Sequence, residues 1–396
     1  MGRDNLLRLA SIYIIVFISL IDHSTIAPVI TQYAKKLGAS DTVAGLIAAS
    51  YSIAAIFMLP VVGFLLNKFL RTRIIQILLL LDTVVTYLYT APLNPYQLLV
   101  VRLVHGAADA GVFPGILAIF RDIVIRRLGL NLTIYWILAA TPIIIGNYIT
   151  RHLVSTYGFH SVFFFVASLY LLGLVLSLYI HQEYRSIILS RKENINASIE
   201  RIDPIILATA YLAGFALYLA LGVVIGSMGL LISSRFGVSR ELASAEVASW
   251  SMYSSLVSLI FILTLTSYMT RGSRNLLITL LIGSLSILIS MTIAMISVEP
   301  LPRILSSIVF GGALGTILPA SSKAATDVSF KRRGFSAALL SLSYLLGVSI
   351  GAPVSSRILE GSRGIVYNIN FLPPMVVSLI VIILISVNII RLRNRR

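Results

Sequence analysis

Twelve apolar stretches of about 20 residues each constrain the fold of this chain more than any other feature of its sequence. A helix of about 20 apolar residues is long enough to cross the hydrocarbon core of a bilayer. Hydrophobic residues make up 58% of the 396 residues and charged residues only 12%, which is too apolar for an ordinary soluble protein. We therefore predict an all-α membrane protein with twelve transmembrane helices. The stretches are residues 7–31, 42–66, 73–91, 96–120, 130–150, 161–181, 205–232, 242–268, 275–297, 303–324, 334–356 and 369–390.

The positive charges are distributed unequally between the two sides of these predicted spans. An even number of spans puts both termini on one side, and 22 of the 31 Lys and Arg residues lie there, against 8 in the opposite loops. Because cytoplasmic loops carry the excess of Lys and Arg, we expect cytoplasmic termini in a plasma-membrane protein. The net charge of +16 then reflects membrane orientation, and we expect no nucleic-acid partner. The first stretch is too long for a signal-peptide core, so we expect it to be retained.

The longest polar stretch, residues 182–204, separates the sixth predicted span from the seventh. Pro142 in the fifth span has a counterpart in Pro353 in the eleventh, which indicates a weak internal repeat. We predict two pseudo-symmetric six-helix bundles, residues 1–181 and 205–396, joined by a cytoplasmic linker over residues 182–204. Many transporters are built from repeated halves and bind their substrate at the interface of the repeats near mid-membrane.

The fourth predicted span carries Arg102, His105 and Asp109. Their spacing of i, i+3 and i+7 puts them on one face of a helix. A charge that faces hydrocarbon costs at least about 2.5–3.5 kcal/mol, so we expect this face to line an interior or a wet cavity. Gly106 and Gly111 lie beside it, and small residues allow another helix to approach closely. The pattern predicts the wall of a transport path.

The turn after the second predicted span, GFLLNKFLRTR at residues 63–73, resembles the signature G-x-L-x-D-R-x-G-R-R of the major facilitator superfamily. Asn67 stands in place of the acid, Leu70 in place of the second glycine and Thr72 in place of a basic residue. Further matches fall along the chain in the family's order: Asp22-x5-Pro28, Arg102-x-x-His105-Gly106, Tyr157 to His160, and Arg333-Gly334. Because the resemblance covers nearly the whole chain, it implies the superfamily's fold of two six-helix bundles.

In that superfamily the basic turn works as a latch on the cytoplasmic side. The resemblance implies that Asn67 faces residues 334–336 and that Arg71 pairs with Asp122. The alternative is a plain basic loop that follows the positive-inside rule. The predicted cytoplasmic gate consists of Gly63, Asn67, Lys68, Arg71, Asp122 and Gly334.

Asp22 and Arg102 each lie about 10–14 Å below the outer surface, at a rise of 1.5 Å per residue. They meet only if the first and fourth spans are adjacent, as they are in the resembled family. We predict that Asp22 accepts a proton and that Arg102 gates it; the alternative is a static ion pair between two helices. His105 and Asp109 are candidates for a proton relay or for substrate contact. We assign no role to Asp82 in the third span.

The second half carries few charges within its predicted spans and has aromatic residues with polar tips instead. Such residues suit the wall of a cavity for an amphipathic substrate, although aromatic residues in spans also serve as packing. Gly347 and Gly351 favour a close helix contact. The candidate cavity residues are His23, Tyr211, Tyr218, Trp250, Tyr253 and Tyr344, and His23 points about 100° away from its neighbour Asp22.

These features predict a proton-coupled secondary transporter that moves a small organic solute by alternating access. One alternative is a drug or metabolite exporter, because the first-span pattern resembles the drug-exporting branch; the fifth span keeps only Pro142 and Gly146 of the antiporters' G-P-x-x-G-G. Another is a divalent metal carrier that uses Asp22, His23, His105 and Asp109, since imidazole and carboxylate bind such ions.

The ATPase motif G-x4-G-K-[ST] and the hydrolase motifs H-E-x-x-H and G-x-S-x-G are missing, and cysteine is absent. We expect a monomer in the lipid bilayer that is not an enzyme and has no cofactor, with protons and a small molecule as its partners.

Overall fold

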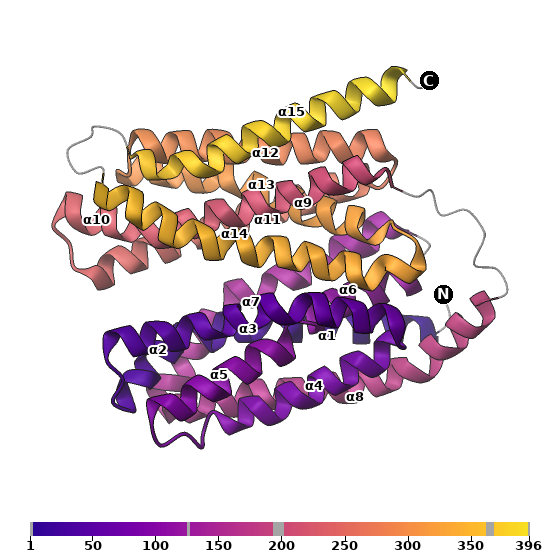
Figure 1. Cartoon of the computed structure of the whole chain (residues 1–396), viewed down its shortest axis with the longest axis horizontal. Helices are drawn as coiled ribbons and strands as arrows, with labels where there is room; N and C mark the ends of the chain where they lie inside the picture. The colour runs from indigo at the N-terminus through magenta and orange to yellow at the C-terminus, as the bar shows by residue number, and fades with distance from the viewer. Residues whose placement is uncertain (1–2, 125–126, 193–201, 362–367, 395–396) are drawn as a thin grey trace. The chain divides into compact units, whose positions relative to one another are not determined.

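The computed structural model describes residues 3–124, 127–192, 202–361 and 368–394, and these residues form helices joined by short turns (Figure 1). The helices of the first half are α1 (Arg3–Thr25), α2 (Ala27–Lys36), α3 (Asp41–Lys68), α4 (Arg71–Leu88), α5 (Pro95–Asp109), α6 (Val112–Ile123), α7 (Leu128–Tyr157) and α8 (Phe159–Lys192). Those of the second half are α9 (Pro204–Val223), α10 (Gly229–Phe236), α11 (Arg240–Met269), α12 (Ser273–Ile296), α13 (Pro300–Thr326), α14 (Arg333–Gly361) and α15 (Leu372–Asn394).

Ten helices in the described part of the chain are long and apolar enough to cross a membrane. The bent pair of α1 and α2 makes an eleventh span. The predicted third span corresponds to α4, whose 18 residues include the ionisable side chains of Arg71, Arg73 and Asp82. The predicted all-α membrane fold is confirmed. The described helices supply eleven apolar spans where twelve were expected, because α4 carries three ionisable residues.

The chain divides into two compact units, which we describe separately. The two units do not simply divide at the predicted boundary between residues 181 and 205. Residues 127–136 of the first half belong to the second unit, and residues 328–339 of the second half belong to the first. Residues 193–201 of the predicted linker lie outside the described residues. The first unit comprises Met1–Arg126, Ile137–Glu200 and Val328–Leu339, and the second comprises Arg127–Trp136, Arg201–Asp327 and Leu340–Arg396.

In the first unit, α3 packs against α5, and α8 packs against both α4 and α1. The approach of α5 to α3 depends on Gly106, because a Cβ atom at this position would overlap the backbone carbonyl of Tyr51. A Cβ at Gly111 would likewise overlap the side chains of Val62 and Leu78. The close helix approach predicted from these two glycines is confirmed, and it brings Arg102 against α3.

We expect Gly106→Ala to lower the free energy of unfolding by about 1–3 kcal/mol, because overpacking a tight contact forces backbone shifts of this cost. Thermal unfolding of the purified protein in detergent measures the change. The matched control is Gly173→Ala, whose added Cβ would lie 3.5 Å from Ile18 and Leu79 and would gain up to about 1 kcal/mol of helix propensity. Equal stability of the two variants would contradict a tight contact at Gly106.

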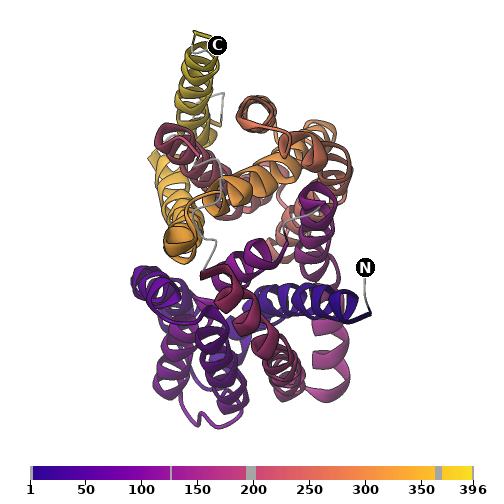
Figure 2. The ribbon, with the colours of Figure 1, turned by 90° about the vertical axis from the view of Figure 1, so that its right-hand side faces the viewer.

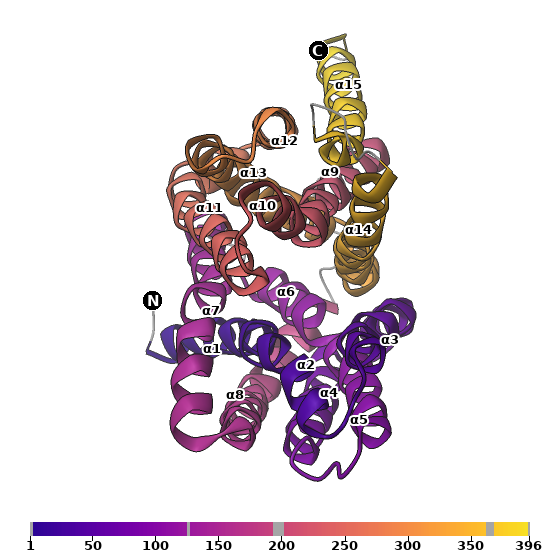
Figure 3. The ribbon, with the colours of Figure 1, turned by 90° about the vertical axis from the view of Figure 1, so that its left-hand side faces the viewer.

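Two spans of the first unit are broken near a proline. Pro28 has no N–H to continue the helix, and α1 and α2 meet at a bend of 51° (Figure 3). The hydroxyl of Thr150 on α7 donates to the carbonyl of Thr25 at this bend, at 3.2 Å, which satisfies an acceptor that the break exposes. Pro114, the third residue of α6, similarly leaves the carbonyl of Ala110 without its helical donor. The fourth predicted span remains one span, Pro95–Ile123, with an interruption between α5 and α6.

In the second unit, α13 packs against α11 and α12, and α15, yellow in Figure 2, packs against α12 and α9. The predicted seventh span consists of α9, a π-helical segment at Val224–Met228, and α10. Cβ atoms added at Gly347 and Gly351 of α14 would meet the backbone of Phe215 and Leu219 on α9. The close helix contact predicted for these two glycines is confirmed.

Candidate functional site

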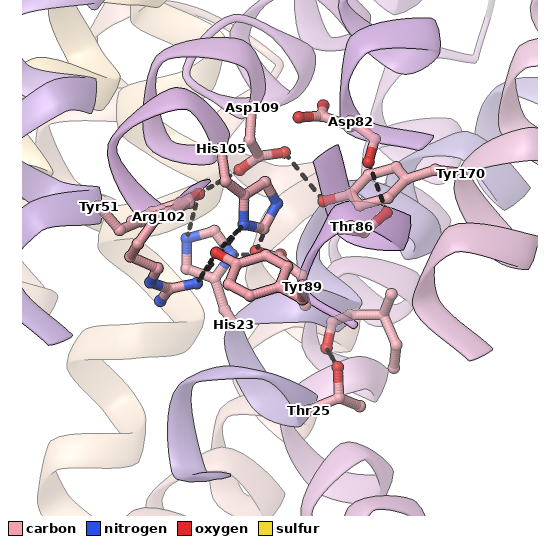
Figure 4. A network of polar contacts seen from close by, with 12 residues as sticks. His23, Thr25, Tyr51, Asp82, Thr86, Tyr89, Arg102, His105, Asp109 and Tyr170 are labelled. Carbon is pink, nitrogen blue, oxygen red and sulfur yellow. Dashed lines mark hydrogen bonds and ion pairs between the residues drawn. The ribbon is translucent and has the colours of Figure 1, made fainter. Parts of the chain in front are cut away.

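The two broken spans of the first unit carry buried acids beside their breaks. Asp22 lies three residues before the end of α1, and Asp109 is the last residue of α5. The two residues are 2% and 5% exposed, respectively. Both belong to one network of polar contacts, in which His23 and Tyr51 connect Asp22 to Asp109. Figure 4 shows His23, Tyr51 and Asp109 in this network. The prolines that break the helices therefore also set where the acids sit within the unit.

Asp22 has two histidine neighbours. Nδ1 of His23 lies 2.7 Å from Oδ1 of Asp22, and Nε2 of His105 on α5 lies 3.9 Å from Oδ2. His105 is fully buried, and within the described chain its Nε2 has no hydrogen-bond partner. The carboxylate of Asp22 thus lies between one histidine in contact and a second just beyond hydrogen-bonding distance.

Arg102 lies on the other side of His105. Its Nη1 donates to the hydroxyl of Tyr89 at 3.2 Å and lies 3.4 Å from Nδ1 of His105. The hydroxyl of Tyr89 lies 3.0 Å from the same nitrogen. A guanidinium can only donate, so Nδ1 of His105 accepts. We therefore assign the hydrogen of the neutral ring to Nε2, on the side of Asp22.

Asp109 is held by two tyrosines. The hydroxyl of Tyr51 on α3 donates to its Oδ2, and the hydroxyl of Tyr170 on α8 donates to its Oδ1 at 3.1 Å. The Tyr51 hydroxyl also lies 3.4 Å from Nε2 of His23. The guanidinium carbon of Arg102 lies 4.6 Å from the centre of the Tyr51 ring, a cation–π distance. Tyr51 therefore connects the Asp109 end of the network to the Asp22 end.

The direct ion pair expected between Asp22 and Arg102 is not formed in this structure, as far as the described residues show. His105 lies near both side chains instead, and the guanidinium of Arg102 is engaged by the ring of Tyr51 and the hydroxyl of Tyr89. The structure nevertheless brings all four predicted coupling residues into one network. They are Asp22, Arg102, His105 and Asp109.

His23 is more closely involved than its helical position indicated. Its side chain bonds to its own neighbour Asp22 and is 46% exposed, so it is the accessible member of an otherwise buried group. Sequence reasoning also missed Tyr51, Tyr89 and Tyr170, which link the ionisable residues to one another. The available signal was a set of tyrosines within predicted spans, but tyrosine in a span is usually packing or interfacial.

Three members of the network form a possible cation site. One ligand atom from each of Asp22, His23 and Asp109 can be chosen so that all lie within 4.8 Å of one another. Two ligands of one zinc ion, at about 2.0–2.1 Å each, are at most about 4.2 Å apart. A modest contraction would therefore be enough for these side chains to bind a divalent cation.

A second cluster lies at the other end of the first unit, around Asp122. Arg71 donates to its Oδ2 and Arg333 to its Oδ1, and all three residues are almost fully buried. The hydroxyl of Tyr184 donates to Oδ2 at 2.6 Å. Burial and the adjacent Asp122 carboxylate raise the pKa of Tyr184 above its ordinary value, so it remains a donor. The pair of Arg71 with Asp122 implied by the resemblance is present, and Arg333 is an addition that we did not predict.

The other expected gate residues surround this cluster. Oδ1 of Asn67 accepts from the backbone N–H of Phe335 in the first turn of α14, at 3.1 Å. A Cβ at Gly63 or Gly334 would meet α14 or α3, respectively. The exposed Lys68 lies over the rings of Phe64 and Phe69, at 5.7 and 5.5 Å. Asn67 therefore meets the segment that the motif predicted, as a neutral partner of a helix N-terminus.

The candidate aromatic residues of the second unit lie in three different environments. Tyr218 and Tyr344 stack at 4.5 Å, with the hydroxyl of Tyr344 2.7 Å from that of Ser321, and Tyr211 packs against the same cluster. Trp250 is buried against Phe310 and donates to Ser306, so its geometry favours the packing alternative. Tyr253 is 38% exposed.

A family model described as the Major Facilitator Superfamily matches residues 12–298, well over half of the chain. The chain belongs to the major facilitator superfamily. It is therefore a multi-pass membrane protein and a secondary transporter rather than an enzyme, and transporters of this superfamily bind small molecules within the membrane. The family assignment predicted from the Gly63–Arg73 turn together with the other motifs along the chain is confirmed.

Solved structures of superfamily members share the fold of this chain at low sequence identity. The human organic anion transporter MFSD10 (TETRAN) superimposes with a TM-score of 0.76 at 12% identity, covering 97% of this chain and 100% of that one. The proton:xylose symporter XylE superimposes with a TM-score of 0.71 at 13% identity, covering 98% and 95%. At such identities the likeness establishes the fold alone.

Curated relatives in the superfamily match only a part of this chain. The bacillibactin exporter of Bacillus subtilis is 27% identical over 124 residues, and the multidrug resistance protein MdtG of Dickeya zeae is 30% identical over 110. The quinolone resistance protein NorA of Staphylococcus aureus is 27% identical over 112 residues. These matches cover 30%, 27% and 29% of the relatives' lengths, so the chain aligns with less than a third of each.

We expect Asn67→Asp to stabilise the conformation in which this residue caps α14, which in the superfamily is the outward-facing one. A carboxylate at a helix N-terminus adds about 0.3–1 kcal/mol, or about a two- to fivefold change in population. Labelling of a Ser329→Cys reporter from the cytoplasmic side should fall by this factor, because the chain has no other cysteine. Asn67→Ala is the matched control and should increase labelling; unchanged or increased labelling in Asn67→Asp would count against the latch.

Proposed function

We propose that this transporter couples the movement of a small organic solute to protons by alternating access, with Asp22 as the proton acceptor. The observation that carries the proposal is the position of Asp22. It is a buried carboxylate between two histidines, in a network that also holds Arg102 and Asp109. Intramembrane ionisable groups are costly, and their default interpretation is functional.

The network supplies a way to load and unload that proton. A carboxylate that loses a cationic or donating neighbour binds a proton more readily. His105 lies between Asp22 and Arg102, so a shift of α5 relative to α1 changes both of these influences on Asp22 together. In this proposal Arg102 acts through His105 and Tyr89 rather than by direct contact with the acid. The partly exposed ring of His23 is the route by which a proton reaches Asp22.

Export of an organic compound is the direction that the relatives support. Their names describe a bacillibactin exporter and drug resistance proteins, which agrees with the resemblance of the first span to the drug-exporting branch. The polar, partly exposed Tyr253 and the cluster of Tyr211, Tyr218 and Tyr344 are the second unit's candidates for contact with an amphipathic compound. We also propose cytoplasmic termini and a plasma-membrane location, on the distribution of Lys and Arg.

A screen of labelled organic compounds in vesicles containing the purified protein tests this function. An imposed pH gradient should drive accumulation of the substrate, and a protonophore should abolish it. An antiporter accumulates substrate when the lumen is acidic, and a symporter accumulates it when the lumen is alkaline, so the two gradient directions separate export from import. Accumulation of a compound that does not respond to either gradient would refute proton coupling.

A divalent metal carrier is the second candidate, and the closeness of ligand atoms from Asp22, His23 and Asp109 favours it. His105 would add a fourth ligand only after losing the hydrogen that we assign to its Nε2, which has no partner within the described chain. Imidazole with carboxylate is a donor set suited to manganese, cobalt, nickel or zinc ions. Thermal stabilisation of the purified protein by one of these ions, lost in His23→Ala, would support this candidate. Absence of stabilisation by all four would remove it.

A further inference from the structure

Asp82 on α4 is a buried acid that the proposed coupling network does not use. Its residue is fully buried, and both carboxyl oxygens lack a hydrogen-bond partner in the described part of the chain. Its backbone carbonyl accepts from the hydroxyl of Thr86 at 2.5 Å. It lies eleven residues after the start of α4 and six before its end, so about 16 Å and 9 Å of helix separate it from the two ends.

The groups that act electrostatically on Asp82 come from three neighbouring helices and from its own. They are the carboxylates of Asp109 on α5 and Asp22 on α1, the hydroxyl of Tyr170 on α8, and the hydroxyl of Tyr89 at the end of α4. Within the described part of the chain, no cation is among these groups. Figure 4 shows the Asp82 carboxyl turned toward the end of the network that Asp109 and Tyr170 form.

This environment decides which form of Asp82 is present. An ionised carboxylate without partner or counter-charge costs several kcal/mol in a protein interior, and two nearby carboxylates increase that cost. A neutral carboxylic acid without partners costs only about 1–3 kcal/mol. Asp82 therefore holds a proton in this structure. No contact in the described part of the chain offsets the cost of burying this neutral acid. An acid with a purely structural role would have such a contact.

We propose that Asp82 is a second proton-carrying group of this transporter, exchanging its proton with Asp109 through the hydroxyl of Tyr170. The hydroxyl of Tyr170 already donates to Oδ1 of Asp109. When the carboxyl of Asp82 reaches the oxygen of Tyr170, its O–H bond breaks and a new O–H bond forms on Tyr170. The original Tyr170 proton passes to Asp109 in the same step. Asp82 becomes a carboxylate, Asp109 becomes a neutral acid, and Tyr170 is unchanged.

This proposal extends the proton coupling proposed above. Proton exchange at Asp82 matters for transport only if the protein is a proton-coupled transporter. With Asp22 and Asp82 both carrying protons, the transporter would move more than one proton in each cycle. The protonated state of Asp82 and its exchange route can be tested without any substrate. The vesicle screen tests proton coupling by itself, so either proposal can fail while the other stands.

Infrared spectroscopy tests the protonated state, because a protonated carboxyl has a C=O band well separated from carboxylate bands. The full-length protein is measured at about neutral pH in a detergent without ester groups, whose carbonyls would overlap the band. We expect the band in wild type and its loss in Asp82→Asn, which keeps the size of the side chain. The matched control Asp203→Asn, an acid paired with Arg391 outside the predicted spans, should leave the band unchanged. A band that is missing from wild type, or that survives in Asp82→Asn, overturns the proposal.

Transfer into D2O tests the exchange route, because deuteration shifts the same band at the rate at which Asp82 exchanges its proton. We expect Tyr170→Phe to slow this shift at least about tenfold, at the low end of what positioned proton-transfer groups contribute. Tyr344→Phe, which removes a buried hydroxyl from the second unit, should not slow it. An unchanged rate in Tyr170→Phe overturns the route.

If Asp82→Asn does not fold, the double variant of Asp22→Asn with Asp109→Asn tests the protonated state instead. A C=O band that survives in this double variant supports a protonated Asp82, and loss of the band refutes it.

Discussion

Asp22→Asn should lower the accumulation of substrate against its gradient while leaving downhill exchange in place. The amide keeps the size and hydrogen-bonding capacity of the side chain but cannot carry a proton. A pH difference of one unit is worth about 1.4 kcal/mol for each proton, or about tenfold accumulation. The variant should lose the share of accumulation that the Asp22 proton drives, and vesicles with an imposed pH gradient measure it. Exchange of labelled for unlabelled substrate without a gradient shows that the variant still binds and moves substrate.

Asp203→Asn is the matched control for this experiment. Asp203 caps the N-terminus of α9 and pairs with Arg391 at 3.4 Å, and asparagine caps helices about as well as aspartate. Vesicles with the Asp203→Asn variant should accumulate as much substrate as vesicles with wild type. If Asp22→Asn accumulates substrate as wild type does, Asp22 is not the coupling acid. Loss of both accumulation and exchange would place Asp22 in substrate binding instead.

Much of the fold could be predicted, because crossing a bilayer imposes a length and a composition that remain legible in one sequence. The breaks in the first and fourth spans were less accessible. Pro28 and Pro114 are visible in the sequence, but proline in a membrane helix produces either a mild kink or a full break, depending on what satisfies the freed carbonyl. At the first break the hydroxyl of Thr150 donates to the carbonyl of Thr25, from a helix more than a hundred residues away in the sequence.

The coupling residues were predictable as residues but not as contacts. Charge within an apolar stretch singled out Asp22 and Arg102, and helical spacing put Arg102 and His105 on one face. The sequence offers no measure of the rotation of one helix against another, or of the side-chain rotamer. These decide that Arg102 lies over Tyr51 and bonds to Tyr89 rather than reaching Asp22.

Local geometry explains the misjudgement of His23. A helical rotation of about 100° separates it from Asp22, which predicted that the two side chains diverge. Nδ1 of His23 nevertheless lies 2.7 Å from the adjacent carboxylate, two residues before α1 ends. Near the end of a helix a flexible pair of neighbours can fold toward each other, and the sequence pattern does not record it.

The gate around Asp122 was the most predictable site, because a motif with known partners identified Arg71 and Asn67. Arg333 was visible only as the start of the eleventh span. Its contact with Oδ1 makes Asp122 a counter-charge shared by two buried guanidinium groups. A carboxylate has two oxygens and can accept from a different arginine on each. This geometry makes Asp122 the ionisable residue whose loss should cost the most stability.

Asp122→Asn should lower the free energy of unfolding by about 3–5 kcal/mol, the cost of removing one partner from a buried charged cluster. The amide keeps the volume but removes the negative charge that the guanidinium groups of Arg71 and Arg333 share. Denaturant unfolding in detergent measures the loss. Glu246→Gln is the control, because it removes the same charge from a pair with Arg303 in which Glu246 is 39% exposed, where about 0–1 kcal/mol is expected. Equal losses of unfolding free energy in the two variants would show that burying the Asp122 cluster does not increase its contribution to stability.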